Sequence, residues 1–373
     1  MASLKHTSLP QATALACHEV LLGSVAELPP EWACQGFAQR PARTWALKQN
    51  NGGPCGVLAS VQAHLLRQIR GKFSDLQFSD ATSAQTSEAL VHAIATIIWA
   101  CRVGRSATVV SCKSMNLPPV REVGDYLIST QCTCLNEVTD AVKAAIGAFC
   151  RPNGPGVALL LYSAILTRGL AMIARDADFP TPLILPNGYC AQELVNLLLF
   201  GRATSNVFDG ERLSGGDSGI RLRGVQRASP IGFLTLFERQ GSLLRSANAE
   251  GEESLILVGR QLKNPTTPIF VIQSEAHYSV LWTSGPCFNL GVPAYGDESV
   301  VEESNGEELP AGGTFDVFHF DQMDERDDPV RLTLKRRCDG DSAHSIHAPP
   351  LEQVINTRWP DAVVDWNGNE TLL

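Results

Sequence analysis

Aromatic residues are scarce in this sequence of 373 residues, where Phe, Trp and Tyr together make up 7%. The core must therefore be built mainly from Leu, Val, Ile and Ala. Long apolar runs are missing too, because the longest, Val157 to Leu166, is too short to cross a bilayer. We therefore expect no membrane partner. The shares of 44% apolar and 18% charged residues indicate a folded protein rather than a disordered one.

An excess of basic residues is also missing, since the formal net charge is -9 at pH 7. An acidic chain repels phosphate backbones, which argues against nucleic acid as a partner. A polypeptide partner that carries basic groups would instead be attracted.

The cysteines do not form the pattern of a disulfide framework. They number 11, an odd count, and most of them are scattered through apolar stretches. Buried free thiols fit that distribution better. The amino terminus is a poor signal peptide, because His18 and Glu19 interrupt its best apolar run. We therefore expect a reducing compartment, either cytoplasmic or nuclear.

Metal-binding patterns are weak. Cys132 and Cys134 form a short pair, but no second pair of ligands has a matching spacing. Cys338 is followed by His344 and His347, yet that stretch has no second cysteine. We therefore expect neither a metal nor another cofactor.

The order of the predicted elements indicates an α+β fold. We expect an amino-terminal arm over residues 1–40 and a single catalytic domain over 41–373, with no internal repeat and no linker that splits it. Its helical part runs over about 41–210 and its strand-rich part over about 230–373. Apolar periodicity predicts helices from Cys55 onward and over 89–103, 137–149, 157–174 and 190–201. Runs of β-branched and aromatic residues predict strands over 231–238, 269–273, 278–283, 315–320 and 330–334, and acidic composition predicts an exposed loop over 297–313.

Cys55 has the local sequence of an activated thiol. Gly52-Gly53-Pro54 forces a turn, and apolar residues then recur with a helical period, so Cys55 opens a helix. Backbone N–H groups at a helix start favour the thiolate. A small buried thiol behind a glycine-rich turn is the competing interpretation. A phosphate-binding loop is disfavoured, because the Lys-Ser/Thr of such loops is missing.

The residues just before Cys55 add to this interpretation. Gln49 lies six residues upstream, where a papain-like arrangement sends the side-chain amide toward a developing oxyanion. The backbone N–H of Cys55 is the second donor. Gly52 and Gly53 leave room for a substrate backbone, and a narrow groove beside them would select for residues without side chains.

A base for Cys55 must be a histidine that is distant in the sequence. His64 is excluded because it lies nine residues along the same helix, about 13 Å further on. His277 sits between two strand-like runs, next to a turn, where its side chain can face a cleft. His319, inside another predicted strand, is the second choice.

Five sequence blocks resemble the MINDY family of deubiquitinases. The block QNNGGPCGVLASVQA is similar to the catalytic-cysteine block of the branch that reads GGPCGVLA, rather than to the branch with a GPCPLLA-like motif. Four further blocks follow in family order: CAQELVNLLLFGRATSNVFDG at 190–210, SEAHYSVLW at 274–282, FDVFHFDQM at 315–323 and TRWPDAVVDWNG at 357–368. The resemblance runs from about residue 45 to the end.

The resemblance implies a papain-like cysteine protease fold, with a helical lobe that carries the cysteine followed by a mainly antiparallel sheet that carries the histidine. It implies hydrolysis of isopeptide bonds in polyubiquitin, preferentially Lys48-linked chains (ubiquitin numbering), with ubiquitin as the partner. Carried over by position, Cys55 is the nucleophile, His277 the general base and Gln49 the oxyanion-hole glutamine. Position 319 departs from the family's usual Tyr, which argues against His319 as the base. A third catalytic residue is not obvious, with Asp316 as one candidate.

Two other functions stay open at this level. The chain could be a ubiquitin-binding protein that keeps the fold with weak or no catalysis, although Gln49, Cys55 and His277 are all present. It could also be a papain-like hydrolase of another amide substrate.

Overall fold

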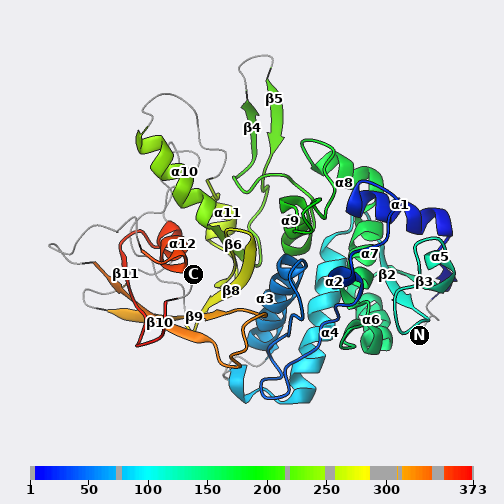
Figure 1. The fold of residues 1–373 in the computed structure, drawn as a ribbon, viewed down its shortest axis with the longest axis horizontal. Coiled ribbons are helices and arrows are strands. Elements are labelled where there is room, and N and C mark those ends of the chain that lie inside the picture. Colours follow the sequence, from blue (N-terminus) through cyan, green and yellow to red (C-terminus); the bar gives the residue numbers. More distant parts are fainter. Residues whose placement is uncertain are drawn as a thin grey trace. The chain divides into compact units, whose positions relative to one another are not determined.

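The computed structural model describes residues 5–72, 78–214, 219–247, 257–285, 309, 313–337 and 348–371 (Figure 1). These residues form two compact units. Unit 1 comprises Met1–Ser205 and Gln322–Asp327, and unit 2 comprises Asn206–Asp321 and Asp328–Leu373. The chain thus leaves unit 2 after Asp321, contributes a short segment to unit 1, and returns to unit 2 at Asp328. The mixture of helices and sheets confirms the α+β class. The single catalytic domain over 41–373 stays a prediction.

Unit 1 is mainly helical. Its long helices are α1 (Gln11–Leu22), α3 (Cys55–Lys72), α4 (Ser83–Ala100), α6 (Leu135–Phe149), α7 (Gly156–Arg168) and α9 (Gln192–Phe200); the short ones are α2 (Pro30–Ala33), α5 (Val123–Tyr126), α8 (Leu170–Asp176) and the 3₁₀ turn η1 (Phe78–Asp80). A three-stranded sheet of order β1-β3-β2 joins them, with β1 (His6–Ser8), β2 (Ala107–Cys112) and β3 (Leu127–Cys132). The predicted arm 1–40 therefore contains a strand and two helices.

The helix α3 is the buried centre of unit 1. Val57, Leu58, Val61 and Leu65 are all 0% exposed, as expected from the apolar period that predicted this helix. Two helical predictions need adjustment. The predicted helix 157–174 is broken at Gly169, whose φ of 84° ends α7 and starts α8. The strands β2 and β3 lie inside the part that was expected to be helical.

Unit 2 is built on a six-stranded sheet of order β11-β10-β9-β8-β7-β6. Its strands are β6 (Gly232–Thr235), β7 (Ile269–Ser274), β8 (His277–Thr283), β9 (Thr314–Phe320), β10 (Val330–Arg336) and β11 (Ala362–Asp365); β6 runs parallel to β7 and the other neighbours are antiparallel. The helices are α10 (Leu236–Ala247), α11 (Arg260–Lys263) and α12 (Pro350–Arg358), and β4 (Glu211–Ser214) pairs with β5 (Ile220–Arg223). The predicted strands at 269, 278, 315 and 330 are confirmed, whereas the one predicted over 231–238 stops at Thr235, where α10 begins.

The core of unit 2 lies between the sheet and α12. Leu281, Val317 and Ile355 are among its fully buried members. Phe270 packs edge-to-face against Trp359, with ring centroids 5.7 Å apart. One face of β8 and β9 is therefore apolar in the middle of the sheet, which fixes the orientation of every second side chain along both strands.

Several expectations lie outside the described residues. They include most of the predicted acidic loop 297–313 and the stretch with Cys338, His344 and His347. Within the described residues, no single helix is long and apolar enough to cross a membrane; α7 and α8 reach that length only together, across a bend of 84°.

Candidate active site

Cys55 is the first residue of α3, as the sequence predicts. The turn before it depends on Gly53, whose φ of 108° is accessible to glycine and strained for other residues. The carbonyl of Pro54 accepts hydrogen bonds from the backbone N–H groups of Val57 and Leu58, both at 3.0 Å. The thiol of Cys55 therefore sits where the N–H groups of a long helix point.

A second thiol lies beneath the start of this helix. Cys190 is buried, and its Sγ lies 3.9 Å from the carbonyl oxygen of Gly53, the same distance as the Sγ of Cys55. Burial, together with the neighbouring Cys55, raises the pKa of Cys190 well above its ordinary value. A Cβ on Gly56 would lie 2.9 Å from the Sγ of Cys190, so only glycine fits there without a shift. Cys190 is therefore a packing residue and a poor nucleophile.

Four other cysteines also stay protonated. Burial raises the pKa to about 12 for Cys17, Cys101 and Cys150, and to about 11 for Cys132. A thiol with such a pKa has almost no thiolate at neutral pH. Cys17, Cys101 and Cys132 are buried and act as small apolar core residues, whereas Cys150 is half-buried.

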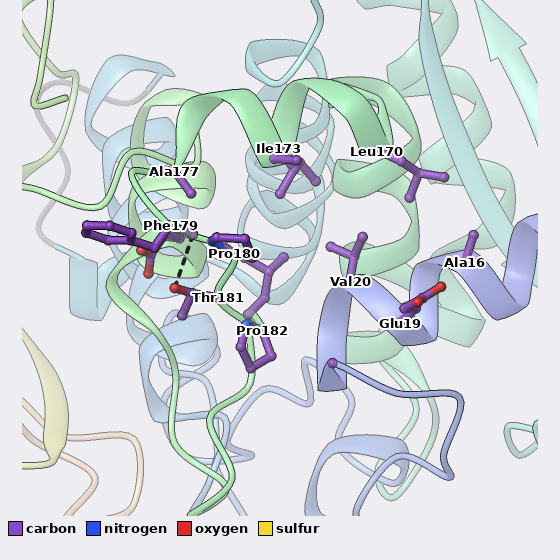
Figure 2. Close-up of a pocket in the computed structure, with 14 residues that line it drawn as sticks. Ala16, Glu19, Val20, Leu170, Ile173, Ala177, Phe179, Pro180, Thr181 and Pro182 are labelled. Carbon is purple, nitrogen blue, oxygen red and sulfur yellow. Dashed lines mark hydrogen bonds between the residues drawn. The ribbon is translucent and has the colours of Figure 1, made fainter. Parts of the chain in front are cut away.

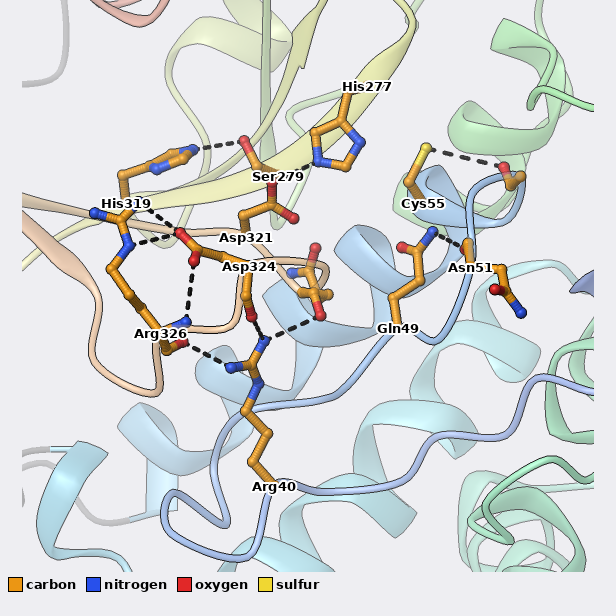
Figure 3. A network of polar contacts seen from close by, with 12 residues as sticks. Arg40, Gln49, Asn51, Cys55, His277, Ser279, His319, Asp321, Asp324 and Arg326 are labelled. Carbon is orange, nitrogen blue, oxygen red and sulfur yellow. Dashed lines mark hydrogen bonds and ion pairs between the residues drawn. The ribbon is translucent and has the colours of Figure 1, made fainter. Parts of the chain in front are cut away.

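Hydrogen bonds fix the backbone at Gln49 and at the residue that follows it. Its N–H donates to the carbonyl of Gln322 at 3.0 Å, and the next N–H, of Asn50, donates to Oε1 of Gln35 at 2.9 Å. The side-chain Nε2 of Gln49 donates one hydrogen to the carbonyl of Asn51 at 2.6 Å (Figure 3). An amide nitrogen carries two hydrogens, so one donor of Gln49 has no partner among the described residues.

The segment that accepts from Gln49 is anchored by a buried arginine. The guanidinium of Arg40 donates to the carbonyls of Gln322 at 3.1 Å and Arg326 at 2.7 Å, and also to that of Asp324. The carboxylate of Asp327 lies 3.5 Å from it. Charge-assisted bonds of this kind are stronger than neutral ones, so the segment 322–327 is firmly attached to unit 1 (Figure 3).

In unit 2, His277 is the first residue of β8. A turn of only two residues, Glu275 and Ala276, joins it to β7, and Glu275 takes the left-handed φ of 54° that such turns require. The Nε2 of His277 lies 2.7 Å from the carboxylate of Asp321, directly after β9 (Figure 3). The two residues form a hydrogen-bonded acid–imidazole pair.

Asp316 was the wrong candidate for this role. It accepts from Oγ1 of Thr333 at 2.7 Å and pairs with Arg331 at 2.9 Å. Along a strand, side chains alternate between faces, so Asp316 and Asp321, five residues apart, point to opposite sides of β9. His319 shares the face of Asp321 and lies 2.8 Å from the hydroxyl of Ser279, which gives it a structural partner.

Asp321 is the residue that sequence reasoning missed. Counting alternate positions from Phe315 through Val317 and His319 leads to Asp321 on the core-facing side of β9. The register pairs Leu281 with His319. His277 is on the same face of β8 as Leu281, and Asp321 is on the same side of β9 as His319, so the two side chains lie on one face of the sheet. The alternate positions along β9 can be counted from the sequence alone, but the register between β8 and β9 cannot be read from it.

The predicted residues divide between the two units. Gln49, Gly52, Gly53 and Cys55 follow one another in unit 1, and His277 lies in unit 2. Each half has the chemistry that its role needs: a thiol at a helix start with an amide donor nearby, and an imidazole held by a carboxylate. Their roles stay predictions at this point.

Unit 1 contains an apolar cavity and a polar cavity. An apolar cavity of about 450 Å³ lies between α1 and α8, lined by residues such as Val20, Leu170 and Ile173 (Figure 2). Its lining contains neither cysteine nor histidine. A smaller polar cavity of about 390 Å³ lies beside Gly52 and Gly53. Among the described residues, no group of His, Cys, Asp and Glu side chains could hold a metal ion.

The chain is similar in sequence to proteins that are named as deubiquitinating enzymes. The sequence model described as "Deubiquitinating enzyme MINDY-3/4, conserved domain" matches residues 18–368. The chain is 34% identical over 363 residues to the mouse protein named probable ubiquitin carboxyl-terminal hydrolase MINDY-4, covering 92% of this chain and 44% of the mouse protein. The human protein of that name is 34% identical over 362 residues, covering 92% and 43%.

A second group of relatives covers less of the chain. The human ubiquitin carboxyl-terminal hydrolase MINDY-3 is 33% identical over 280 residues, covering 66% of this chain and 59% of that protein. The chain thus spans less than half of the MINDY-4 relatives that it matches. No solved structure matches the chain.

Proposed function

The chain belongs to the MINDY-3/4 family, and from that premise we propose that it is a cysteine-dependent deubiquitinase that hydrolyses isopeptide bonds in polyubiquitin. The names of its relatives support ubiquitin as the substrate. Cys55 is the nucleophile, His277 the general base, Asp321 the positioning residue of the base and Gln49 an oxyanion donor.

The observation that carries the proposal is the hydrogen bond between Nε2 of His277 and Asp321. A carboxylate at Nε2 favours the neutral tautomer with its proton on that nitrogen, and therefore puts the ring's lone pair on Nδ1. The nitrogen that accepts the thiol proton is then Nδ1. This pair of carboxylate and imidazole supports a papain-like mechanism, and with it the papain-like fold class.

The first half of the reaction forms a thioester. His277 takes the proton of Cys55, and the thiolate attacks the carbonyl carbon of the last ubiquitin glycine. The oxygen becomes an oxyanion, which accepts hydrogen bonds from the Cys55 backbone N–H and the second Nε2 hydrogen of Gln49. The intermediate collapses, the bond to the lysine nitrogen breaks, and protonated His277 returns the proton to the departing amine.

The second half releases ubiquitin. His277 removes a proton from a water molecule, the hydroxide attacks the thioester carbonyl, and the carbon–sulfur bond breaks. Cys55 leaves as a thiolate and is reprotonated from His277. The reaction needs a reduced thiol, so we place the protein in a reducing compartment such as the cytoplasm or nucleus. We further propose Lys48-linked chains as its preferred polyubiquitin.

The test is cleavage of purified ubiquitin dimers of each linkage by the full chain. We expect cleavage of Lys48-linked dimers, no cleavage by Cys55→Ala, and near-normal cleavage by Cys190→Ala, the matched control from the same part of unit 1. Cleavage that survives Cys55→Ala would refute the mechanism. If the protein binds polyubiquitin but neither cleaves it nor is labelled by an electrophilic ubiquitin, it is a non-catalytic ubiquitin-binding protein instead.

A further inference from the structure

Two buried glutamines of unit 1 are joined through their backbones. Gln49 is 4% exposed and Gln322 is 0% exposed. The backbone N–H of Gln49 donates to the carbonyl of Gln322 at 3.0 Å, and the guanidinium of Arg40 donates to the same carbonyl at 3.1 Å. These bonds fix the backbones of the two glutamines relative to each other, six residues before Cys55 on one side.

The side-chain amides of these two residues are incompletely satisfied. Neither Oε1 nor Nε2 of Gln322 has a hydrogen-bond partner among the described residues, and the same holds for Oε1 of Gln49. The Nε2 of Gln49 donates one hydrogen to the carbonyl of Asn51 (Figure 3). A buried amide without partners destabilises the folded state, whereas an apolar side chain of the same shape does not. Gln322 therefore has a chemistry that packing alone does not explain.

The unsatisfied atoms of the two residues are complementary. Gln322 has a donor in its Nε2, and Gln49 has an acceptor in its Oε1. A glutamine side chain turns about three bonds, and the two backbones are already hydrogen-bonded, so a change of rotamer can join these two atoms. A donor on the oxygen of an amide polarises the whole group and strengthens the hydrogen bonds that its nitrogen donates. Gln322 can thereby strengthen the donor of Gln49.

We propose that Gln322 is a positioning residue for Gln49. While the oxyanion forms, Nε2 of Gln322 donates to Oε1 of Gln49 and holds that amide with its second Nε2 hydrogen toward the oxyanion. This inference rests on the proposed function, in which Gln49 is an oxyanion donor. Gln322 acts through Gln49 and touches no reacting atom.

Gln322→Met tests this role, because it keeps the length of the side chain and removes both polar groups. We expect kcat for cleavage of ubiquitin dimers to fall about tenfold with KM unchanged, less than the roughly 10²–10³-fold loss that follows removal of an oxyanion donor itself. The unfolding temperature should stay the same or rise, because no buried amide is left unsatisfied at that position. Alkylation of Cys55 by iodoacetamide, followed by mass spectrometry, should keep its rate, because this displacement forms no oxyanion.

Further variants show whether Gln322 acts through Gln49. In a protein that carries Gln49→Ala, Gln322→Met should lower the rate by less than about twofold, because the amide that it positions is gone. Gln39→Met is the matched control, since Nε2 of Gln39 is also buried without a partner among the described residues of unit 1. It should keep kcat within about twofold of the unchanged protein, because it supports no oxyanion donor. If Gln322→Met fails to fold, the same measurements on Gln322→Glu, which keeps the shape and replaces the donor with an acceptor, decide instead.

Each result supports the inference or overturns it. If Gln322→Met cleaves ubiquitin dimers at the normal rate while Gln49→Ala does not, the positioning role is refuted and the proposed function stands. If Gln322→Met loses as much activity beside Gln49→Ala as it does alone, or slows alkylation of Cys55, Gln322 acts by another route and the inference is wrong. If the unchanged protein does not cleave ubiquitin dimers, the proposed function is refuted and this inference with it.

Discussion

The helical unit and the sheet unit hold their reactive groups in different ways. In unit 1, Cys55 gains its surroundings from neighbours in sequence: a turn of two glycines and a proline, the N–H groups of α3, and Gln49. In unit 2, His277 gains its partner from the pairing of β8 with β9, which brings Asp321 within 2.7 Å from 44 residues away. Local sequence therefore specifies the surroundings of the Cys55 thiol, and sheet register specifies those of the His277 imidazole.

The segment 322–327 belongs to this comparison as well. Asp321 is the last residue of unit 2 before the chain enters unit 1, and the next residue, Gln322, accepts the backbone hydrogen bond of Gln49. The carboxylate bonded to His277 and the backbone carbonyl bonded to Gln49 thus belong to covalent neighbours. Variants in each unit measure how far that unit depends on its own mode of support.

The largest effect is expected for the base. His277→Ala should lower the rate of dimer cleavage about 10³-fold, because general-base catalysis by a positioned imidazole is lost. His319→Asn is the matched control, since His319 lies on the same sheet and is bound to Ser279. It should stay within about threefold of the unchanged protein, because it moves no proton of the reaction. A His277→Ala rate within tenfold of normal would show that unit 2 does not supply the base.

The next effect concerns stability. Lys263→Met removes one partner of an ion pair in unit 2 in which Lys263 and Glu238 lie 2.5 Å apart, with side-chain exposures of 0% and 3%. The stranded carboxylate should lower the free energy of unfolding by about 3–5 kcal/mol. Urea denaturation followed by hydrogen exchange of α10 and α11 measures the loss.

A double replacement controls for lost packing. Lys263→Met with Glu238→Leu should recover most of the stability, because the buried carboxylate is removed together with its partner. Arg168→Met is the counterpart in unit 1, where Arg168 donates twice to Asp176, at 2.6 and 2.7 Å. If both single variants expose the same amides to exchange, the two units unfold together. That result would contradict the view that each unit is stabilised separately.

A smaller effect is expected for the positioning carboxylate. Asp321→Ala should slow cleavage roughly 10- to 100-fold, since the imidazole loses the group that fixes its tautomer and orientation. Its pH–rate profile should change shape, which a purely structural residue would not cause. Asp316→Ala, on the opposite face of β9, should leave both rate and profile nearly unchanged. Equal losses for the two variants would contradict the assignment.

The smallest effect is a pH dependence that unit 1 supplies. Burial lowers the pKa of His64, in α3, from 6.5 to about 3. Below pH 6.5, His64 becomes protonated in the unfolded chain but stays neutral in the folded protein down to about pH 3. Acid therefore favours unfolding. Between pH 6.5 and 5.5 this should remove about 1 kcal/mol of stability.

His64→Met should remove that part of the pH dependence. The comparison of interest is the slope of unfolding free energy against pH, because the substitution also changes packing. Hydrogen exchange within α3 should report the same change. An unchanged slope in His64→Met would mean that His64 is not the group that titrates.

Features with local support could be predicted from the sequence, and features that depend on distant residues could not. The start of α3 at Cys55 was predictable because turn and helix signals lie within a dozen residues. The strand β2 was missed because its support is distant: the N–H groups of Thr108 and Val110 donate to the hydroxyls of Thr167 and Ser163 on α7, at 2.9 and 2.8 Å. No local pattern announces such bonds.

The site shows the same contrast. Cys55, Gln49 and His277 were identified from turn, helix and strand signals and from motif resemblance. Asp321 required the register between β8 and β9. The sequence left the partner of His277 open, with Asp316 as one candidate, because position in the sequence does not show which strands pair.

In the proposed mechanism, the thiol of unit 1 and the imidazole of unit 2 act on one carbonyl. A crystal structure of the protein, covalently joined through Cys55 to an electrophilic ubiquitin, would show whether they do. We expect Nδ1 of His277 to lie within about 4 Å of the sulfur while Nε2 keeps its hydrogen bond to Asp321. An imidazole that is turned away from the sulfur and separated from it by other side chains in that complex would refute the mechanism.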